Sequence, residues 1–156
     1  MTATGEGEAD LPALPDWERR AAGLLIVTGP HAMPISTAVR AGDRRLVFGL
    51  ARRRETLARL REDSRAAFAL LAKGMAFTAY GDAGVVREKL DGAPNVAGVE
   101  LRVERVQNHL ADGRTEMLSA AGWRWRREEA READRTVVAA IEALARAGAS
   151  ATPDWG

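Results

Sequence analysis

The chain contains no cysteine, only two lysines and no long apolar run. The absence of cysteine excludes disulfides, thiolate zinc sites and cysteine nucleophiles, and it is compatible with a reducing compartment. No stretch approaches the ~20 apolar residues of a membrane-spanning helix. The acidic N-terminal segment has neither the basic start nor the apolar core of a signal peptide. We therefore expect a cytoplasmic protein with no membrane partner.

A strong charge of either sign is also absent, since the formal net charge is +1. Without a basic field, the chain has no general means of attracting nucleic acid, so any anion site must be local. The only histidines are His31 and His109, which are too few for the three or four ligands of a typical metal site. We predict no metal site and no nucleic-acid partner.

The size and composition predict one globular domain. The chain has 156 residues, of which 46% are hydrophobic and 29% charged. That length is enough for a single core without covalent cross-links. Residues 1–15 are acidic and rich in proline and glycine, and we expect them to form a flexible tail. The folded domain is predicted to span residues 16–148, with a second loose tail at residues 149–156.

Short apolar runs separated by turn signals predict strands rather than long helices. Glycine-containing turns follow several of these runs, and the parity of the last one shifts near Glu104 and Arg105, which predicts a β-bulge. The expected strands are residues 23–28, 33–40, 45–51, 66–72, 77–87 and 99–106, with a weaker candidate at 115–126.

Helical periodicity occurs in three places. Asp16 is a candidate cap for a short helix over residues 17–22. Residues 53–62 place Thr56, Leu57 and Leu60 on one face, and residues 128–147 have a longer apolar stripe that ends before a glycine. Six or seven strands with few helices favour a mainly β, α+β domain, either a barrel or a sandwich.

Residues 45–68 (RLVFGLARRRETLARLREDSRAAF) resemble a signature region of the pyridoxamine 5'-phosphate oxidase-like family. In that family a strand is followed by a basic loop, a short helix with a leucine, a proline, an arginine and an apolar strand. The leucine corresponds to Leu60, Ser64 stands at the proline position, and the arginine is Arg65. The resemblance extends over about residues 23–110, and it implies an antiparallel split β-barrel with a short helix after the third strand and a C-terminal helix.

The resemblance also implies FMN, held in a cleft between the two subunits of a homodimer, and a flavin-dependent oxidoreductase acting on a small-molecule substrate that the sequence does not identify. One alternative is a deazaflavin-dependent reductase. Another is a non-enzymatic carrier of flavin or haem, or a degenerate member that has lost its cofactor. No residue stands out as a catalytic acid or base.

The residues that the resemblance assigns to the cofactor lie in two strands, a basic loop and a helix. The family's loop serine falls on Arg54, the next arginine on Glu55 and the phosphate-binding lysine on Thr56, so none of the three is kept. Arg52, Arg53 and Arg54 could replace the lost charge, although a run of arginines can also be simply solvated. The expected cofactor-binding residues are Ser36, Thr37, Ala38, Val39, Leu50, Ala51, Arg52, Arg53, Arg54, Thr56 and Leu57.

Three further residues have open roles. Trp123 and Trp125 alternate with arginines and could stack near the cofactor or at the dimer interface, but packing beneath the terminal helix is the simpler expectation. His109 follows a strand near the expected cleft and could contact a ligand. A histidine ligates haem in some split-barrel relatives, which is why haem stays among the alternatives.

Overall fold

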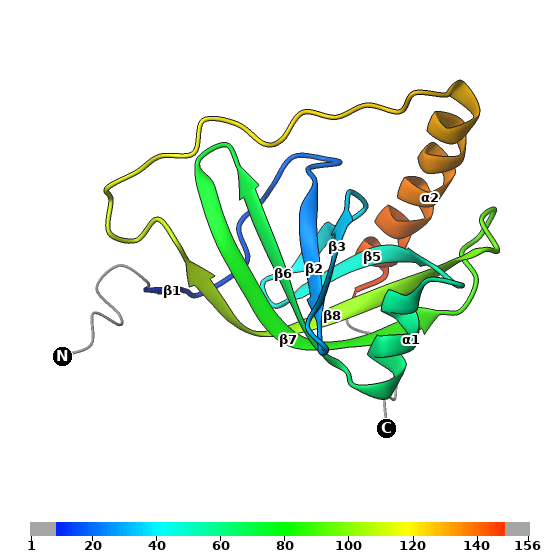
Figure 1. Ribbon diagram of the computed structural model, residues 1–156, viewed down its shortest axis with the longest axis horizontal. Helices are drawn as coiled ribbons and strands as arrows, with labels where there is room; N and C mark the ends of the chain where they lie inside the picture. The colour runs from blue at the N-terminus through cyan, green and yellow to red at the C-terminus, as the bar shows by residue number, and fades with distance from the viewer. Residues whose placement is uncertain (1–8, 149–156) are drawn as a thin grey trace.

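The computed structural model describes residues 9–148, which form one antiparallel sheet with two helices (Figure 1). The α+β class predicted from the sequence is confirmed, and so are the short helix after the strand over residues 45–51 and the terminal helix. The strands are β1 (Asp10–Leu11), β2 (Gly23–Val27), β3 (His31–Ile35), β4 (Val39–Gly42), β5 (Arg45–Ala51), β6 (Arg65–Ala72), β7 (Met75–Arg87) and β8 (Val96–Asn108). The helices are α1 (Glu55–Glu62) and α2 (Glu128–Ala147).

The sheet has the order β3-β2-β6-β7-β8-β5-β4, with β1 paired to β8 outside this path. Every pair of neighbours is antiparallel. β7 and β8 are the two longest strands and lie in the middle of the order. The small β1 strand and the division of one expected strand raise the described number to eight.

A short crossing joins the two edges of the sheet and makes it curve into a split barrel. The sequence predicted one strand over residues 33–40, and this was wrong, because β3 ends at Ile35 on one edge and β4 begins at Val39 on the other. Four residue steps span at most about 14 Å of extended chain, so the two edges must lie close together. Thr37 fixes the crossing, because its Oγ1 accepts a hydrogen bond of 2.9 Å from the Gly49 N–H in β5.

The inner face of the curved sheet contains the main hydrophobic core. Phe48, Phe68 and Phe77 are fully buried there, and the ring of Trp17 lies 5.7 Å from those of Phe68 and Phe77. The predicted helix over residues 17–22 is absent, and this segment is a turn before β2. The physical reason is that Trp17 packs in the core and donates its Nε1–H to the Ala38 carbonyl at 3.0 Å.

The N-terminal part of the described chain is not the loose tail predicted for residues 1–15. Asp10 and Leu11 form β1 against β8, and Leu14 is buried with its N–H bonded to the Asp43 carbonyl at 2.9 Å. The composition of this segment suggested disorder. In the structure, backbone pairing with the end of β8 and the burial of Leu14 hold it against the barrel. The remainder of that predicted tail, and the tail predicted at 149–156, lie outside the described residues.

Helix α2 covers one half of the outer face of the sheet. Ile141 is fully buried with Val47 of β5 and Leu90, and this second cluster is separate from the barrel core. Figure 1 shows α2 against β5, while the long segment that leads to it from β8 crosses over the barrel without forming a strand. The candidate strand at residues 115–126 is therefore wrong. No helix among residues 9–148 is long and apolar enough to cross a membrane.

A β-bulge lies where the sequence predicted one. Tyr80 pairs with Arg105 and Gly81 with Val103, so Glu104 is the extra residue of β8. At this point β7 and β8 approach so closely that a Cβ atom on Gly81 would collide with the carbonyl oxygen of Arg102. Backbone atoms cannot move aside as a flexible side chain would, so only glycine fits.

Replacing Gly81 with alanine is therefore expected to lower the free energy of unfolding by about 2–3 kcal/mol, the upper range for overpacking a core position. Urea unfolding followed by tryptophan fluorescence would measure the change. Gly122→Ala is the matched control, because no atom lies within 4 Å of its added methyl group, and a change within about 0.5 kcal/mol is expected there. Equal stability of the two variants would contradict the close approach.

Candidate functional site

The basic loop between β5 and α1 borders a cavity of about 540 Å³ that is lined by Ala51, Arg52, Arg53 and Asn95. The loop is held at its start by a hydrogen bond of 2.9 Å from the Arg52 N–H to the Asn95 carbonyl. Arg52, Arg53 and Arg54 are all exposed, and no ion pair or side-chain hydrogen bond to another described residue engages them. Two guanidinium groups are thus available to an anion at this cavity, and that of Arg54 follows directly in the loop.

Helix α1 begins directly after this loop with its first turn open. Arg54 is the N-cap residue in an extended conformation, and no side chain caps the helix. The first backbone bond of the helix runs from the Ala58 N–H to the Arg54 carbonyl, at 3.4 Å. The N–H groups of the first turn therefore have no acceptor within the helix. Together with the helix dipole, they favour the binding of an anion.

Thr56 does not take the position of a phosphate ligand. Its side chain is buried, its hydroxyl donates to the Met33 sulfur at 3.1 Å, and it also bonds the His31 Nε2 at 3.0 Å. Leu57 is buried in the barrel core. Of the two helix residues expected to bind a cofactor, each could therefore contribute its backbone N–H but not its side chain.

An acidic residue stands at the first position of α1. The Glu55 carboxylate accepts a hydrogen bond of 2.6 Å from the Arg59 Nε, and His31 Nδ1 lies 3.9 Å away. The hydrogen bond and charge of Arg59, with a smaller effect of His31, lower the pKa of Glu55. A glutamate carboxylate is ionised at neutral pH even with its ordinary pKa, so Glu55 weakens the positive potential of the loop.

The strand residues expected at the cofactor lie close to this loop, and two of the six are buried. Residues 36–38 form the crossing between β3 and β4, and Thr37 is bonded to Gly49 of β5. Ala38 and Leu50 are buried in the core, whereas Ser36, Val39 and Ala51 are partly exposed. The structure therefore brings the two expected strand segments together, with only some of their side chains open to a ligand.

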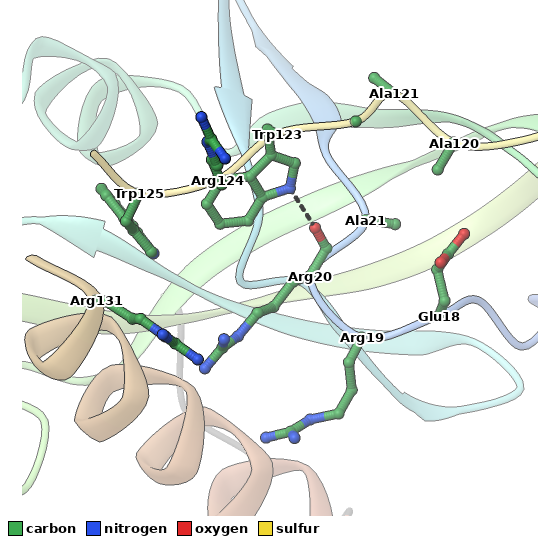
Figure 2. A pocket seen from close by; sticks show the side chains of 11 residues that line it. Glu18, Arg19, Arg20, Ala21, Ala120, Ala121, Trp123, Arg124, Trp125 and Arg131 are labelled. Carbon is green, nitrogen blue, oxygen red and sulfur yellow. Dashed lines mark hydrogen bonds between the residues drawn. The ribbon is translucent and has the colours of Figure 1, made fainter. Parts of the chain in front are cut away.

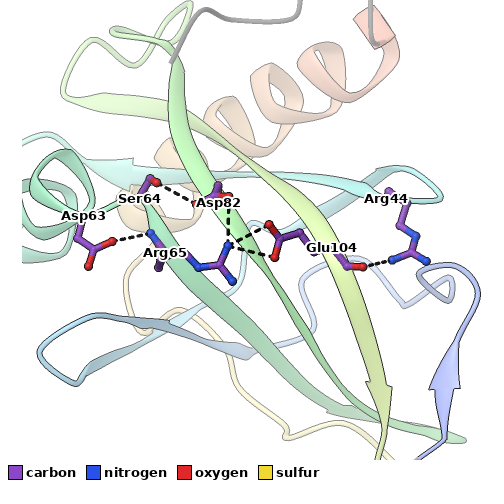
Figure 3. Close-up of polar contacts among 6 residues, drawn as sticks. All are labelled: Arg44, Asp63, Ser64, Arg65, Asp82 and Glu104. Atoms are coloured by element: carbon purple, nitrogen blue, oxygen red, sulfur yellow. Dashed lines mark hydrogen bonds and ion pairs between the residues drawn. The ribbon is translucent and has the colours of Figure 1, made fainter. Parts of the chain in front are cut away.

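Arg65, which matches the family's arginine after the short helix, belongs to an ion-pair network on the outer face of the sheet (Figure 3). Its Nη1 lies 3.1 Å from Asp82 Oδ2 and from both oxygens of Glu104. Glu104 and Asp82 raise the pKa of Arg65, and the Ser64 hydroxyl bonds Asp82 at 2.9 Å. These contacts assign Arg65 a structural role that joins β6, β7 and β8.

Each histidine is hydrogen-bonded to a threonine hydroxyl. His109 is exposed and its Nε2 bonds the Thr78 hydroxyl at 2.7 Å, and His31 bonds Thr56. Among residues 9–148 no group of three or more metal-ligating side chains comes together.

A second cavity, of about 470 Å³, was not predicted from the sequence (Figure 2). It lies where residues 18–21, residues 120–125 and the first turns of α2 meet. Trp123 and Trp125 line it and remain 38% and 41% exposed, so the expected packing of these rings beneath the terminal helix is wrong. The alternation of tryptophan and arginine at residues 123–126 was the available signal.

Comparison with solved structures identifies the barrel. A candidate pyridoxamine 5'-phosphate oxidase from Lactobacillus delbrueckii is 16% identical over 64% of this chain and 98% of its own, with a TM-score of 0.50. A candidate pyridoxamine 5'-phosphate oxidase from Listeria innocua is 14% identical over 56% of this chain and 87% of its own, with a TM-score of 0.47. HupZ from Group A Streptococcus is 14% identical over 65% of this chain and 90% of its own, with a TM-score of 0.46.

At 16% identity, the likeness to the Lactobacillus structure is one of fold. The chain has the split-barrel fold of pyridoxamine 5'-phosphate oxidase-like proteins, as the resemblance of residues 45–68 predicted. No family model and no curated protein matches the chain.

Proposed function

We propose that this protein binds FMN at the loop between β5 and α1 and acts as a flavin-dependent oxidoreductase on a small molecule. The observation that carries the proposal is the meeting of three unpaired arginines, an uncapped helix start and a cavity of about 540 Å³ at one end of a split barrel. When bound, the flavin would supply hydride or electron transfer, and the protein would bind the phosphate, orient the ring and limit access of water.

The charge of the loop fits a phosphate monoester. Such a group carries nearly two negative charges at neutral pH and offers three acceptor oxygens. Guanidinium forks bind phosphate oxygens in pairs, and the first-turn N–H groups of α1 add donors that require no side chain. Because the net charge of the whole chain is only +1, this local grouping is the means of attraction.

A second candidate is a member of the fold that does not carry a flavin. Two observations favour it, namely the burial of the Thr56 hydroxyl beneath Met33 and His31 and the ionised Glu55 carboxylate at the first helical position. Both differ from the lysine and arginine that the resemblance places there. A haem carrier and a deazaflavin-dependent enzyme are further candidates, because each would bind a different cofactor in the same barrel.

The visible spectrum of the purified protein, followed by titration with FMN, a deazaflavin and haem, separates these candidates. A flavin spectrum, or saturable FMN binding with a Kd in the micromolar range or below, is the expected result. Preference for the deazaflavin or for haem would identify the cofactor as a different one. Failure of all three to bind would overturn the proposal in favour of the cofactor-free candidate.

We further propose that the protein is a homodimer that uses the outer face of β2 and β6. This half of the outer face is not covered by α2, and Leu24 and Leu71 are 44% and 56% exposed on it. Leu24 pairs with Ala69, so Leu71 is its diagonal neighbour on the same face. Exposed leucines that are neighbours on one face of a sheet are typical of a surface that a partner covers.

Replacing Leu24 and Leu71 with aspartate is expected to convert the dimer into a chain of 16.8 kDa, as measured by sedimentation equilibrium. Two carboxylates would be buried without partners in the interface, which should weaken association by at least about a hundredfold. Leu118→Asp is the control, because Leu118 is 76% exposed and lies outside the sheet. A monomeric parent protein, or a double variant that remains dimeric, would contradict this surface.

A further inference from the structure

The second cavity joins residues 18–21 to a distant part of the chain, namely residues 120–125 and the first turns of α2. Its volume is about 470 Å³, and no residue that lines it also lines the cavity beside Arg52 and Arg53. The two cavities are therefore separate, and a ligand in the second one needs no flavin. The lining includes the arginines and tryptophans Arg19, Arg20, Trp123, Arg124, Trp125 and Arg131.

Arg20 is held in a conformation that a non-glycine residue rarely adopts. Its φ of 63° is the one positive value of any non-glycine residue among residues 9–148. The Trp123 Nε1–H bonds the Arg20 carbonyl at 2.8 Å, and the buried Asp134 of α2 lies 3.3 Å from the Arg20 Nε. Such backbone strain persists only where the surroundings determine it, and it is concentrated at functional sites. Arg20 thus connects Trp123, through its carbonyl, to α2, through its side chain.

Two of the four arginines have unused hydrogen-bonding capacity. Arg19 and Arg20 are paired with Glu142, at 2.7 Å, and with Asp134. Arg124 makes no ion pair or hydrogen bond within residues 9–148, and Arg131 has only a long contact of 3.8 Å with Glu128. Each guanidinium carries five N–H donors, so most of those on Arg124 and Arg131 are available to a ligand. In Figure 2 the side chains of Arg20 and Arg131 extend toward the same part of the cavity.

The indole rings of Trp123 and Trp125 form an aromatic corner of the cavity. The rings of Trp123 and Trp125 are 5.5 Å apart at an angle of 85°, in a segment that has no regular secondary structure. Each indole is only partly covered by protein. A flat ring placed in this corner would meet the face of one indole and the edge of the other, which are the two favourable geometries between aromatic groups.

We propose that this cavity binds a small planar aromatic molecule that carries an anionic group. The aromatic ring packs against Trp123 and Trp125, and the anion pairs with Arg131, whose side chain extends toward the same part of the cavity as that of Arg20. The volume of about 470 Å³ lies within the ~300–1,000 Å³ that is usual for small-molecule sites. The hydrogen bond from Trp123 to Arg20 keeps the aromatic corner in place before a ligand arrives, so little ordering is required on binding.

Three probes separate the contributions of the ring and the charge. 2-Naphthoate has both, 2-naphthamide has the ring without the charge, and cyclohexanecarboxylate has the charge without the ring. Each is titrated into the full-length protein while the indole N–H signals are followed by nitrogen-15 NMR, with Trp123→Phe and Trp125→Phe used to assign the two signals. We expect 2-naphthoate to shift both signals saturably with a Kd below about 1 mM. The two partial probes should bind at least about tenfold more weakly.

A matched pair of variants tests the cationic half of the site. Arg131→Gln should raise the Kd for 2-naphthoate about tenfold, the usual effect of losing one charge-assisted hydrogen bond. Arg126→Gln removes the same charge from an exposed residue that does not line the cavity, and it should leave the Kd unchanged. The proposal is overturned if neither indole signal shifts, if cyclohexanecarboxylate binds as tightly as 2-naphthoate, or if both variants weaken binding equally.

Discussion

Replacing Arg53 and Arg54 together with alanine is expected to weaken FMN binding about a hundredfold while the fold is retained. Each guanidinium should contribute about a tenfold factor, near the lower limit for a charge-assisted hydrogen bond, because both side chains are exposed to solvent and to salt. Neither residue supports the core, so the free energy of unfolding should change little. Fluorescence titration of FMN at fixed ionic strength measures the effect.

The control for this experiment is Arg126→Ala with Arg127→Ala, which removes the same charge from exposed residues beside α2. If FMN binding depends on local contacts, this variant should bind as the parent does. An equal loss in both double variants would show that long-range charge dominates. Unchanged affinity in the Arg53 and Arg54 variant would place the phosphate elsewhere on the barrel.

Replacing Glu100 with alanine is expected to lower the free energy of unfolding by about 3–5 kcal/mol, because it leaves a buried guanidinium without its partner. The Glu100 and Arg45 side chains are 4% and 12% exposed, and the Glu100 carboxylate accepts a hydrogen bond from the Arg45 Nε. Burial lowers the pKa of Arg45. Arg45 also reaches the Leu144 carbonyl at 3.4 Å, so the pair connects β5 and β8 to the end of α2.

A double variant shows whether the lost stability comes from the unpaired charge or from the loss of side-chain packing. Arg45→Met with Glu100→Leu should recover most of the lost stability, since apolar residues of similar size often replace a buried ion pair at little cost. Asp91→Ala breaks an exposed pair, in which Arg87 and Asp91 are 48% and 85% exposed, and should cost less than about 1 kcal/mol. Urea unfolding measures all three. A loss below about 1 kcal/mol for Glu100→Ala would contradict the role of the pair.

The basic loop is the part of the candidate site that could be predicted from the sequence. The succession of strand, Arg52–Arg54 and helix is local, so turn chemistry and periodicity predicted its order along the chain. The burial of the Thr56 side chain could not be predicted in this way, because its hydroxyl is bonded to Met33 and His31 of β3, more than twenty residues away in sequence. The second cavity, lined by Trp123 and Trp125, could not be predicted for the same reason, since residues 18–21 and residues 120–131 are about a hundred residues apart.

Side-chain periodicity within single segments was enough to predict the class of the fold, the bounds of β5 and α2, and the bulge at Glu104. The burial of each face could not be predicted in this way, because it depends on contacts between distant segments. In β8, Glu100 lies between the core residues Val99 and Leu101 and points to the opposite face of the sheet. Because α2 covers that face, Glu100 is one of the most buried charges in the described chain. Likewise, Trp17 entered the core instead of starting a helix. Local patterns set the direction of a side chain, while the contacts of distant elements set its environment.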